Sequence, residues 1–221
     1  MSKEIQVVPY DPNWPHIYEK EAALIWQALG GNCLAIHHIG STAVPGLAAK
    51  PKIDMIAVVQ SGDLSIAQLK TIGFSYKGEW NIPFKFGFTK RGQDEINLHV
   101  FEEGHPEIEL NILFRDHLRS NPQSLKEYAQ IKETLIEDEA SFQKQKGSMF
   151  SGYNLGKDRF IRQILKTSGY NGHRFLKVTH IQEWEDYHRI RKTGIFDPIG
   201  VVYDPHHPSI TANGAYHFML C

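Results

Sequence analysis

The sequence predicts an α+β fold in which helices flank a mixed sheet. Hydrophobic spacing indicates one helix first, then several strands, and then further helices, without the regular strand–helix alternation of parallel α/β folds. Residues 53–59 form an apolar run that only Asp54 interrupts, which is typical of a strand covered on both faces. The fold class therefore rests on the order of the elements and on this buried strand.

The first half of the chain is expected to supply the sheet. Alternating and continuous apolar runs, bounded by Gly and Pro, assign its elements. The expected strands lie over residues 5–8, 53–59, 84–89 and 95–100, the last two joined by a hairpin turn at 90–93. The expected helices lie over residues 14–29, starting from Asn13 as N-cap and stopping at Gly30, and over residues 64–72.

The second half is expected to be mainly helical. A further strand over 108–113 precedes helices over 122–142 and 160–165. A linker at 168–172 separates a main domain, residues 1–168, from a smaller α/β segment, residues 173–221, with a strand at 175–179 and a helix at 184–191. Because roughly 50 residues rarely build a core alone, this segment should pack on the main domain, on a second copy as a homodimer, or on further sequence.

Composition excludes several classes of function. The chain has 221 residues, with 24 Lys and Arg against 25 Asp and Glu, so no overall basic field attracts nucleic acid. Its apolar runs are too short to span a membrane, and the N-terminus lacks a signal-peptide pattern. Cys33 and Cys221 are too few for a disulfide framework or a zinc ribbon. The cytoplasm is therefore the expected compartment.

The densest pattern lies in the loop at 39–51 and the strand after it. The small residues Gly40, Ser41 and Thr42 allow backbone N–H groups to approach an anion, and Lys50 adds positive charge. The Gly-Lys-Ser/Thr ending of a P-loop is missing. Asp54 follows Ser41 after 12 intervening residues. This spacing is similar to that of the DNA polymerase β-like nucleotidyltransferases, in which Ser and backbone amides hold a triphosphate and strand carboxylates hold Mg²⁺.

Residues from about 5 to 166 resemble the GrpB (UPF0157) family. The stretches that carry this resemblance are VPYDPNW at 8–14, HIGSTAVPGLAAKP at 38–51, NLHV at 97–100, FRD at 114–116 with Leu118 and Arg119, and Lys157 before Phe160 and Ile161. The resemblance implies a nucleotidyltransferase-like fold. It implies no established reaction.

These patterns predict a set of site residues. Asp54 and His99 are the predicted catalytic residues and the predicted ligands of a divalent metal. Ile56 stands where such sites usually carry a second acid, and Asn97 shares a strand face with His99, so the set would favour Zn²⁺ or Mn²⁺ over Mg²⁺. The residues expected to bind a nucleotide triphosphate through its phosphates are Gly40, Ser41, Thr42, Lys50, Arg115 and Lys157.

Two functions stay open at this point. One is metal-dependent nucleotidyl or phosphoryl transfer to an unknown small molecule, and the other is a catalytically silent module that binds a nucleotide or a phosphorylated metabolite. Ile56 in place of an acid favours the second, whereas the intact Gly40-Ser41 turn indicates that an anion still binds. Structural roles are also open, since Asp54 could pair with Arg115 instead of binding a ligand.

The C-terminal segment resembles the opening of a GNAT acetyltransferase domain. The resemblance rests on residues 188–191 and 196–208, and it implies that residues 209–220 form one of the first strands of that domain. The glycine-rich turn that binds the pyrophosphate of acetyl-CoA is absent from residues 173–221. This segment alone therefore cannot be an acetyltransferase, and a docking arm is the alternative.

Overall fold

A five-stranded mixed sheet forms the centre of the main domain. The computed structural model describes residues 6–144, 150–212 and 214–220. The strands are β1 (Cys33–Ile39), β2 (Ile53–Val59), β3 (Ser75–Gly78), β4 (Phe86–Lys90) and β5 (Ile96–Glu102), in the order β1-β2-β5-β4-β3. Strands β2 and β5 run parallel, and the other neighbouring pairs run antiparallel.

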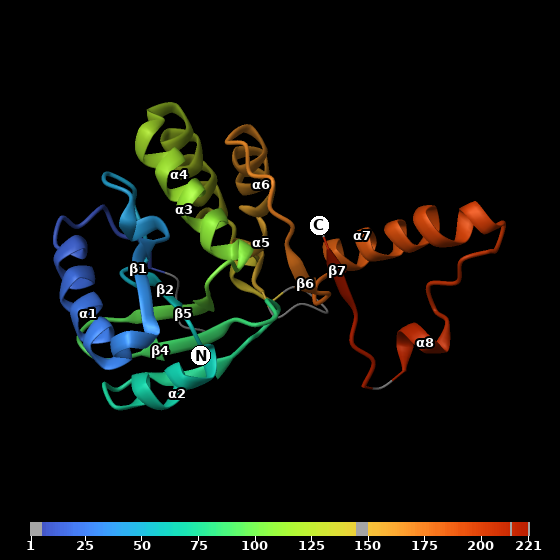
Figure 1. The fold of residues 1–221 in the computed structure, drawn as a ribbon. Coiled ribbons are helices and arrows are strands. Elements are labelled where there is room, and N and C mark those ends of the chain that lie inside the picture. Colours follow the sequence, from blue (N-terminus) through green and yellow to red (C-terminus); the bar gives the residue numbers. More distant parts are fainter. Residues whose placement is uncertain (1–5, 145–149, 213, 221) are drawn as a thin grey trace.

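Helices cover both faces of the sheet (Figure 1). On one face lie α1 (Trp14–Leu29) and α2 (Gly62–Lys70). The layer on the other face contains α3 (Pro106–Ser120), α4 (Pro122–Glu137), α5 (Gly152–Leu155) and α6 (Asp158–Thr167). The predicted α+β class, a mixed sheet flanked by helices, is confirmed. In the described part of the chain, no helix has the length and apolar character needed to cross a membrane.

Strand alternation separates the hydrophobic core from the polar residues of the sheet. Met55 of β2 and Leu98 of β5 are fully buried against Ile25 of α1 and Leu69 of α2. Successive strand residues point to opposite faces, so the neighbours of these core residues lie on the α3 side. These neighbours are Asp54 of β2 and Asn97 and His99 of β5, as the sequence predicts.

The predicted strand at 108–113 is wrong, because these residues belong to α3. Pro106 sits in the first turn, where its missing N–H costs nothing, and the His105 side chain accepts a hydrogen bond of 3.2 Å from the Glu107 backbone. Leu110 and Leu118 are buried at helical spacing. A short apolar run is ambiguous between strand and helix, and here the helix-start residues decide.

Two strands of the sheet are not evident in the sequence. Strand β1 follows the end of α1 at Gly30, and the polar pair His37 and His38 interrupts its apolar pattern. It pairs with β2 so that Ile39 lies opposite Asp54. The edge strand β3 is short and mostly exposed. The strand expected at 5–8 lies partly outside the described residues, and its Val8 forms an isolated bridge with Ala49.

The C-terminal segment, residues 173–221, forms a lobe beside the main domain (Figure 1). Its elements are β6 (Phe175–Lys177), α7 (Ile181–Arg191), α8 (Pro208–Thr211) and β7 (Phe218–Leu220), and β6 pairs with β7 in a separate antiparallel sheet. The stretch expected as a strand over 209–220 begins as a helix, because Pro208 and a hydrogen bond from Ser209 N to the His207 side chain start α8. Only its last three described residues form a strand.

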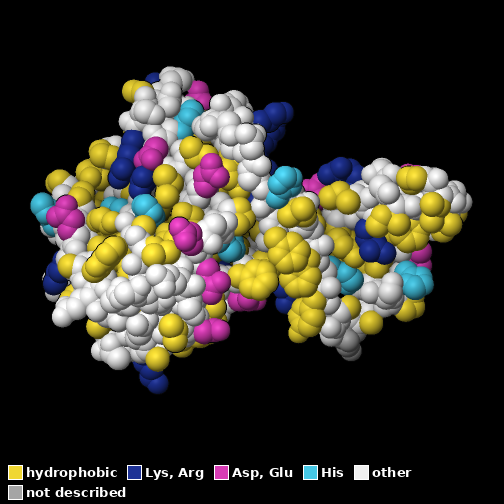
Figure 2. Space-filling model, viewed as in Figure 1, with side chains coloured by type: hydrophobic (Ala, Val, Ile, Leu, Met, Phe, Trp, Pro, Cys, Tyr) yellow, Lys and Arg dark blue, Asp and Glu magenta, His cyan; other side chains and the backbone are white. Residues whose placement is uncertain are grey.

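The lobe has a small core of its own and contacts the main domain at its beginning. Leu176, Tyr187 and Met219 are buried together, and Ile82 of the main domain packs against them. Hydrophobic side chains also gather on the surface of the lobe (Figure 2), where Val202 is 90% exposed. The proposed boundary between residues 1–168 and 173–221 stays a prediction.

We expect a chain that ends at residue 168 to fold. Three hydrophobic clusters of the described residues lie entirely within the main domain, and only the fourth belongs to the lobe. The truncated chain should keep a cooperative thermal transition, measured by circular dichroism. It should lose on the order of 1–3 kcal/mol, because removing Arg174 leaves the buried Glu107 without this partner. Loss of the transition would show that the segment belongs to the main core.

Candidate functional site

A cavity of about 560 Å³ lies on the sheet face opposite the main core. The sheet contributes Asp54, Gly87, Thr89, Asn97 and His99 to its lining. The helical layer contributes Asn154, Lys157, Ile161 and Arg162, and the start of the lobe contributes Arg174, Leu176, His180 and Glu183. This volume is in the range of sites that hold a nucleotide or a metabolite.

Asp54 is the half-buried acid that the sheet contributes to this cavity. Its Oδ1 accepts a hydrogen bond of 2.7 Å from Asn97 Nδ2, and Asn97 Oδ1 accepts one of 2.7 Å from Arg91. Burial raises the pKa of Asp54, although the Asn97 hydrogen bond and the charge of Lys157 oppose this rise. The carboxylate is thus held by neutral and cationic groups and is not in contact with Arg115.

The turn after β1 lies directly against Asp54. Gly40 has φ +70°, and a Cβ atom there would lie 2.8 Å from Asp54 Oδ2. Glycine meets both requirements, the left-handed backbone and the close approach. Ser41 and Ala43 then form a short 3-10 turn that starts the loop leading to β2. The predicted Gly-Ser turn and the predicted strand acid therefore meet in space.

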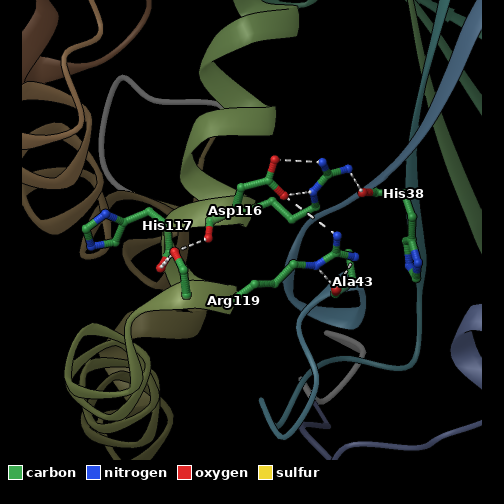
Figure 3. Close-up of polar contacts among 7 residues, drawn as sticks. His38, Ala43, Asp116, His117 and Arg119 are labelled. Atoms are coloured by element: carbon green, nitrogen blue, oxygen red, sulfur yellow. Dashed lines mark hydrogen bonds and ion pairs between the residues drawn. The ribbon is translucent and has the colours of Figure 1, made fainter.

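Two arginines of α3 hold this turn through its backbone (Figure 3). Arg115 donates to the His38 carbonyl at 3.0 Å, and Arg119 donates twice to the Ala43 carbonyl, at 2.9 and 2.7 Å. Asp116 lies between the two arginines, with its Oδ1 2.7 Å from Arg115 Nε and 3.7 Å from Arg119 Nη1. Charged donors on backbone carbonyls make strong hydrogen bonds, so α3 fixes both ends of the turn.

Lys132 of α4 holds the same loop from another side. Its ammonium donates to Ser41 Oγ at 3.2 Å and to the Ala48 carbonyl, and the residue is only 2% exposed. Burial lowers the pKa of Lys132 to about 7, and the charge of Lys157 acts in the same direction. Sequence reasoning did not select Lys132, although a lysine within the apolar spacing of a predicted helix is a signal for such a role.

Two further lysines share one aromatic ring beside the cavity. The ammonium of Lys50 lies 4.2 Å from the centroid of the Tyr153 ring, and that of Lys157 lies 4.3 Å from the same centroid. Burial and the charge of Lys50 together lower the pKa of Lys157 to about 8, and Asp54 opposes this. Burial raises the pKa of Tyr153 to about 12, so this ring adds no negative charge near neutral pH.

The structure brings some of the predicted site residues together. Asp54, His99 and Lys157 line one cavity, and Gly40 touches Asp54. The other predicted residues do not line it: Ser41 contacts Lys132, Thr42 contacts His38 and the Lys52 carbonyl, Lys50 lies on Tyr153, and Arg115 lies on the His38 carbonyl. Lys132 and Tyr153 were not selected, because their contacts with Ser41 and Lys50 join distant parts of the chain. Arg91 was not selected either, although its bond to Asn97 is local.

The residues around Asp54 fit a divalent metal poorly. Burial lowers the pKa of His99 to about 3, with a contribution from the Lys85 charge, so its imidazole is neutral and able to bind a metal. Among the described residues, however, no group of three or more His, Cys, Asp or Glu side chains is placed to hold an ion. Protein sites for zinc usually supply three or four such ligands. A metal on Asp54 and His99 stays a prediction.

The fold and cavity define a class of protein: an α+β domain with a mixed sheet and a cation-rich site beside a Gly-Ser turn. The sequence profile described as GrpB protein matches residues 4–167, and the chain belongs to this family. It is similar to the UPF0157 protein YqkA of Bacillus subtilis, with 35% identity over 179 residues, 79% of this chain and 49% of that protein. It is also similar to the glutamate-rich protein GrpB of Alkalihalophilus pseudofirmus, with 32% identity over 65% of this chain and 90% of that protein.

A solved structure shares the fold. The GrpB protein from Enterococcus faecalis has a TM-score of 0.63 and 32% identity, covering 74% of this chain and 96% of that one. The Cid1 poly(U) polymerase overlays with a TM-score of only 0.36 and 14% identity, too little to assign a function. This chain spans about half the length of YqkA. The family match ends at residue 167, so the resemblance of the lobe to an acetyltransferase stays a prediction.

We expect Gly40→Ala to destabilise the chain more than Gly46→Ala does. Both glycines have positive φ, +70° and +78°, so each substitution adds backbone strain of about 1 kcal/mol or more. At Gly40 the added methyl group also collides with Asp54, whereas at Gly46 it meets nothing within 4 Å. Denaturant unfolding should show an extra loss of about 1–3 kcal/mol for Gly40→Ala. Equal losses would contradict the close approach.

Proposed function

We propose that this chain binds a phosphorylated small molecule of nucleotide size in the cavity beside Asp54. The observation that carries this proposal is the balance of charge. Asp54 is the carboxylate whose charge acts on both Lys50 and Lys157, and these two ammonium groups lie on one ring beside it. One acid cannot neutralise two partly desolvated cations, so an anionic ligand is the missing partner.

A phosphate group suits these cations. Lys157 lines the cavity, and its pKa of about 8 leaves it mostly protonated at neutral pH. Arg91, which also lines the cavity, is positioned by Asn97 and offers further donors to phosphate oxygens. The resemblance of the Gly40 turn and Asp54 to a nucleotidyltransferase site supports a nucleotide as the ligand.

The alternative is a metal-dependent nucleotidyl or phosphoryl transferase. Asp54 and His99 line the same cavity from neighbouring strands, which favours this alternative. Asp54 is the one carboxylate among the strand residues that line the cavity, which argues against it, since a two-metal phosphoryl-transfer site is built from several acids. We also propose the cytoplasm as the compartment, and fusion to an acetyltransferase domain as the context of the lobe.

Asp54→Asn separates the two functions. The amide keeps an oxygen for Asn97 but removes a negative charge from beside Lys157. In a binding module, calorimetry with ATP in the presence of EDTA should give equal or up to about tenfold tighter binding, since one charge contact is worth about 1 kcal/mol. Asp63→Asn, in the first turn of α2 on the other face of the sheet, is the matched control and should change nothing.

The transferase alternative gives the opposite result. Binding or turnover of ATP would then require Mg²⁺, Mn²⁺ or Zn²⁺, and Asp54→Asn would abolish it. Lys157→Met should weaken ATP binding at least tenfold in either case. Parent protein that binds neither ATP nor inorganic tripolyphosphate, with or without metal, would contradict both functions.

Affinity for ATP should fall as the pH rises through about 8. Lys157 is charged below its pKa of about 8 and loses its proton above it, so the attraction for phosphate is present at low pH and lost at high pH. The terminal phosphate titrates near pH 6 and keeps a constant charge in this window. Lys157→Arg, which stays charged, should show a flat profile in calorimetry between about pH 7.5 and about pH 9.5, a window that contains that pKa. A fall of equal size in this variant would exclude Lys157 as the cause.

A further inference from the structure

We propose that residues 174–183 recognise the part of the ligand that is not phosphate. This inference rests on the proposed function. The segment lies outside the family match, which ends at residue 167, yet Arg174, Leu176, His180 and Glu183 line the cavity. The lobe would therefore complete a site that the main domain begins.

The segment is fixed to the main domain at its start. Arg174 Nε lies 2.6 Å from Glu107 Oε1, and Glu107 is buried at the beginning of α3. The Lys177 backbone N–H donates to the Asn81 carbonyl at 3.0 Å. Leu176, between these two contacts, is 2% exposed. Because both flanks of Leu176 are held, this wall is formed before a ligand arrives, which lowers the entropy cost of binding.

His180 is the polar group of the wall. The residue is 5% exposed, and its Nε2 lies 3.1 Å from Glu183 Oε1. His180 is the N-cap residue of α7, where the Glu183 backbone N–H approaches its side chain, but its buried Nδ1 makes no hydrogen bond of good geometry within the described ranges. A buried nitrogen without a partner is unusual in a folded protein and points to a group that the cavity receives.

Glu183 determines which ring nitrogen of His180 donates a hydrogen bond. Burial alone would raise the pKa of Glu183, but hydrogen bonds from His180 and from the Thr179 backbone outweigh it and keep the pKa low. A carboxylate oxygen only accepts, so Nε2 donates to Glu183, and in this tautomer Nδ1 is the acceptor of the ring. The matching ligand atom is then an N–H or O–H donor.

The surroundings of His180 indicate a flat group. Trp80 lines the same cavity and is 51% exposed, with φ +61°, a conformation that is rare for residues other than glycine. The Phe150 ring lies 6.3 Å from the His180 ring at 82°. Phe150 and Leu176 line the cavity with His180, and the Lys85 ammonium lies 5.9 Å from the Trp80 ring centroid, whereas Lys157 lies near Asp54. A ligand with phosphates at one end and a planar base that carries N–H groups at the other fits both parts.

Two probes separate the two parts of the site. Inorganic tripolyphosphate carries phosphates alone, and ATP carries phosphates and a base with an amino group. His180→Gln keeps a donor for Glu183 at the position of Nε2 but removes Nδ1. Calorimetry on the full chain should show at least tenfold weaker ATP binding for this variant and tripolyphosphate binding within twofold of the parent. Lys157→Met should weaken both, and His173→Gln, an exposed neighbour that does not line the cavity, should change neither.

A second variant tests the inference if His180→Gln loses stability. Asn places its amide near the position of Nδ1, so His180→Asn should retain more ATP affinity than His180→Gln. The inference is overturned if the parent binds ATP no more tightly than tripolyphosphate, or if His180→Gln weakens both probes equally or neither. If the parent binds tripolyphosphate, the proposed phosphate site survives those results. If the parent binds neither probe, the proposed function fails as well.

Discussion

The structure depends on the close approach of the Gly40 backbone to the Asp54 carboxylate. Pairing of β1 with β2 places Ile39 opposite Asp54, and the turn that follows leaves no space for a Cβ at Gly40. Such a contact between backbone and carboxylate holds only if the turn cannot relax away from the strand. The α3 arginines on the His38 and Ala43 carbonyls prevent this relaxation, and Lys132 of α4 holds the far side of the loop.

The burial of Lys132 and Lys157 destabilises the folded chain, and a bound anion can offset part of this effect. The pKa of Lys132 falls from 10.5 to about 7 and that of Lys157 from 10.5 to about 8. Between the folded pKa and 10.5, the unfolded chain therefore binds more protons than the folded chain. Each lysine destabilises the fold most at a pH below its folded pKa. This loss of stability becomes smaller as the pH rises towards 10.5. An anion beside Lys157 would keep it charged and remove part of the penalty. Stability and binding are thus coupled through the same side chains.

Local patterns in the sequence predicted the strand residues of the site but not the residues that hold them in place. The apolar run around Asp54 and the alternation around His99 are visible within single strands, and the structure places both residues on one cavity. Strand β1 was missed because His37 and His38 interrupt its apolar pattern. The partners of Arg115 are a carbonyl 77 residues away and a neighbouring acid, and no local pattern reveals a bond to a distant backbone oxygen.

A buried ion pair joins the lobe to the main domain, so the two parts are not structurally independent. Glu107 is 4% exposed and belongs to α3, yet Arg174, which pairs with it, belongs to the segment beyond the family match. A buried carboxylate that loses its cation must take up a proton or recover water, and either change would alter the start of α3. Because α3 also carries the arginines that hold the Gly40 turn, the pair links the lobe to the phosphate end of the cavity. A substitution of Arg174 can therefore affect the surroundings of Asp54 through α3, without direct contact between the two residues.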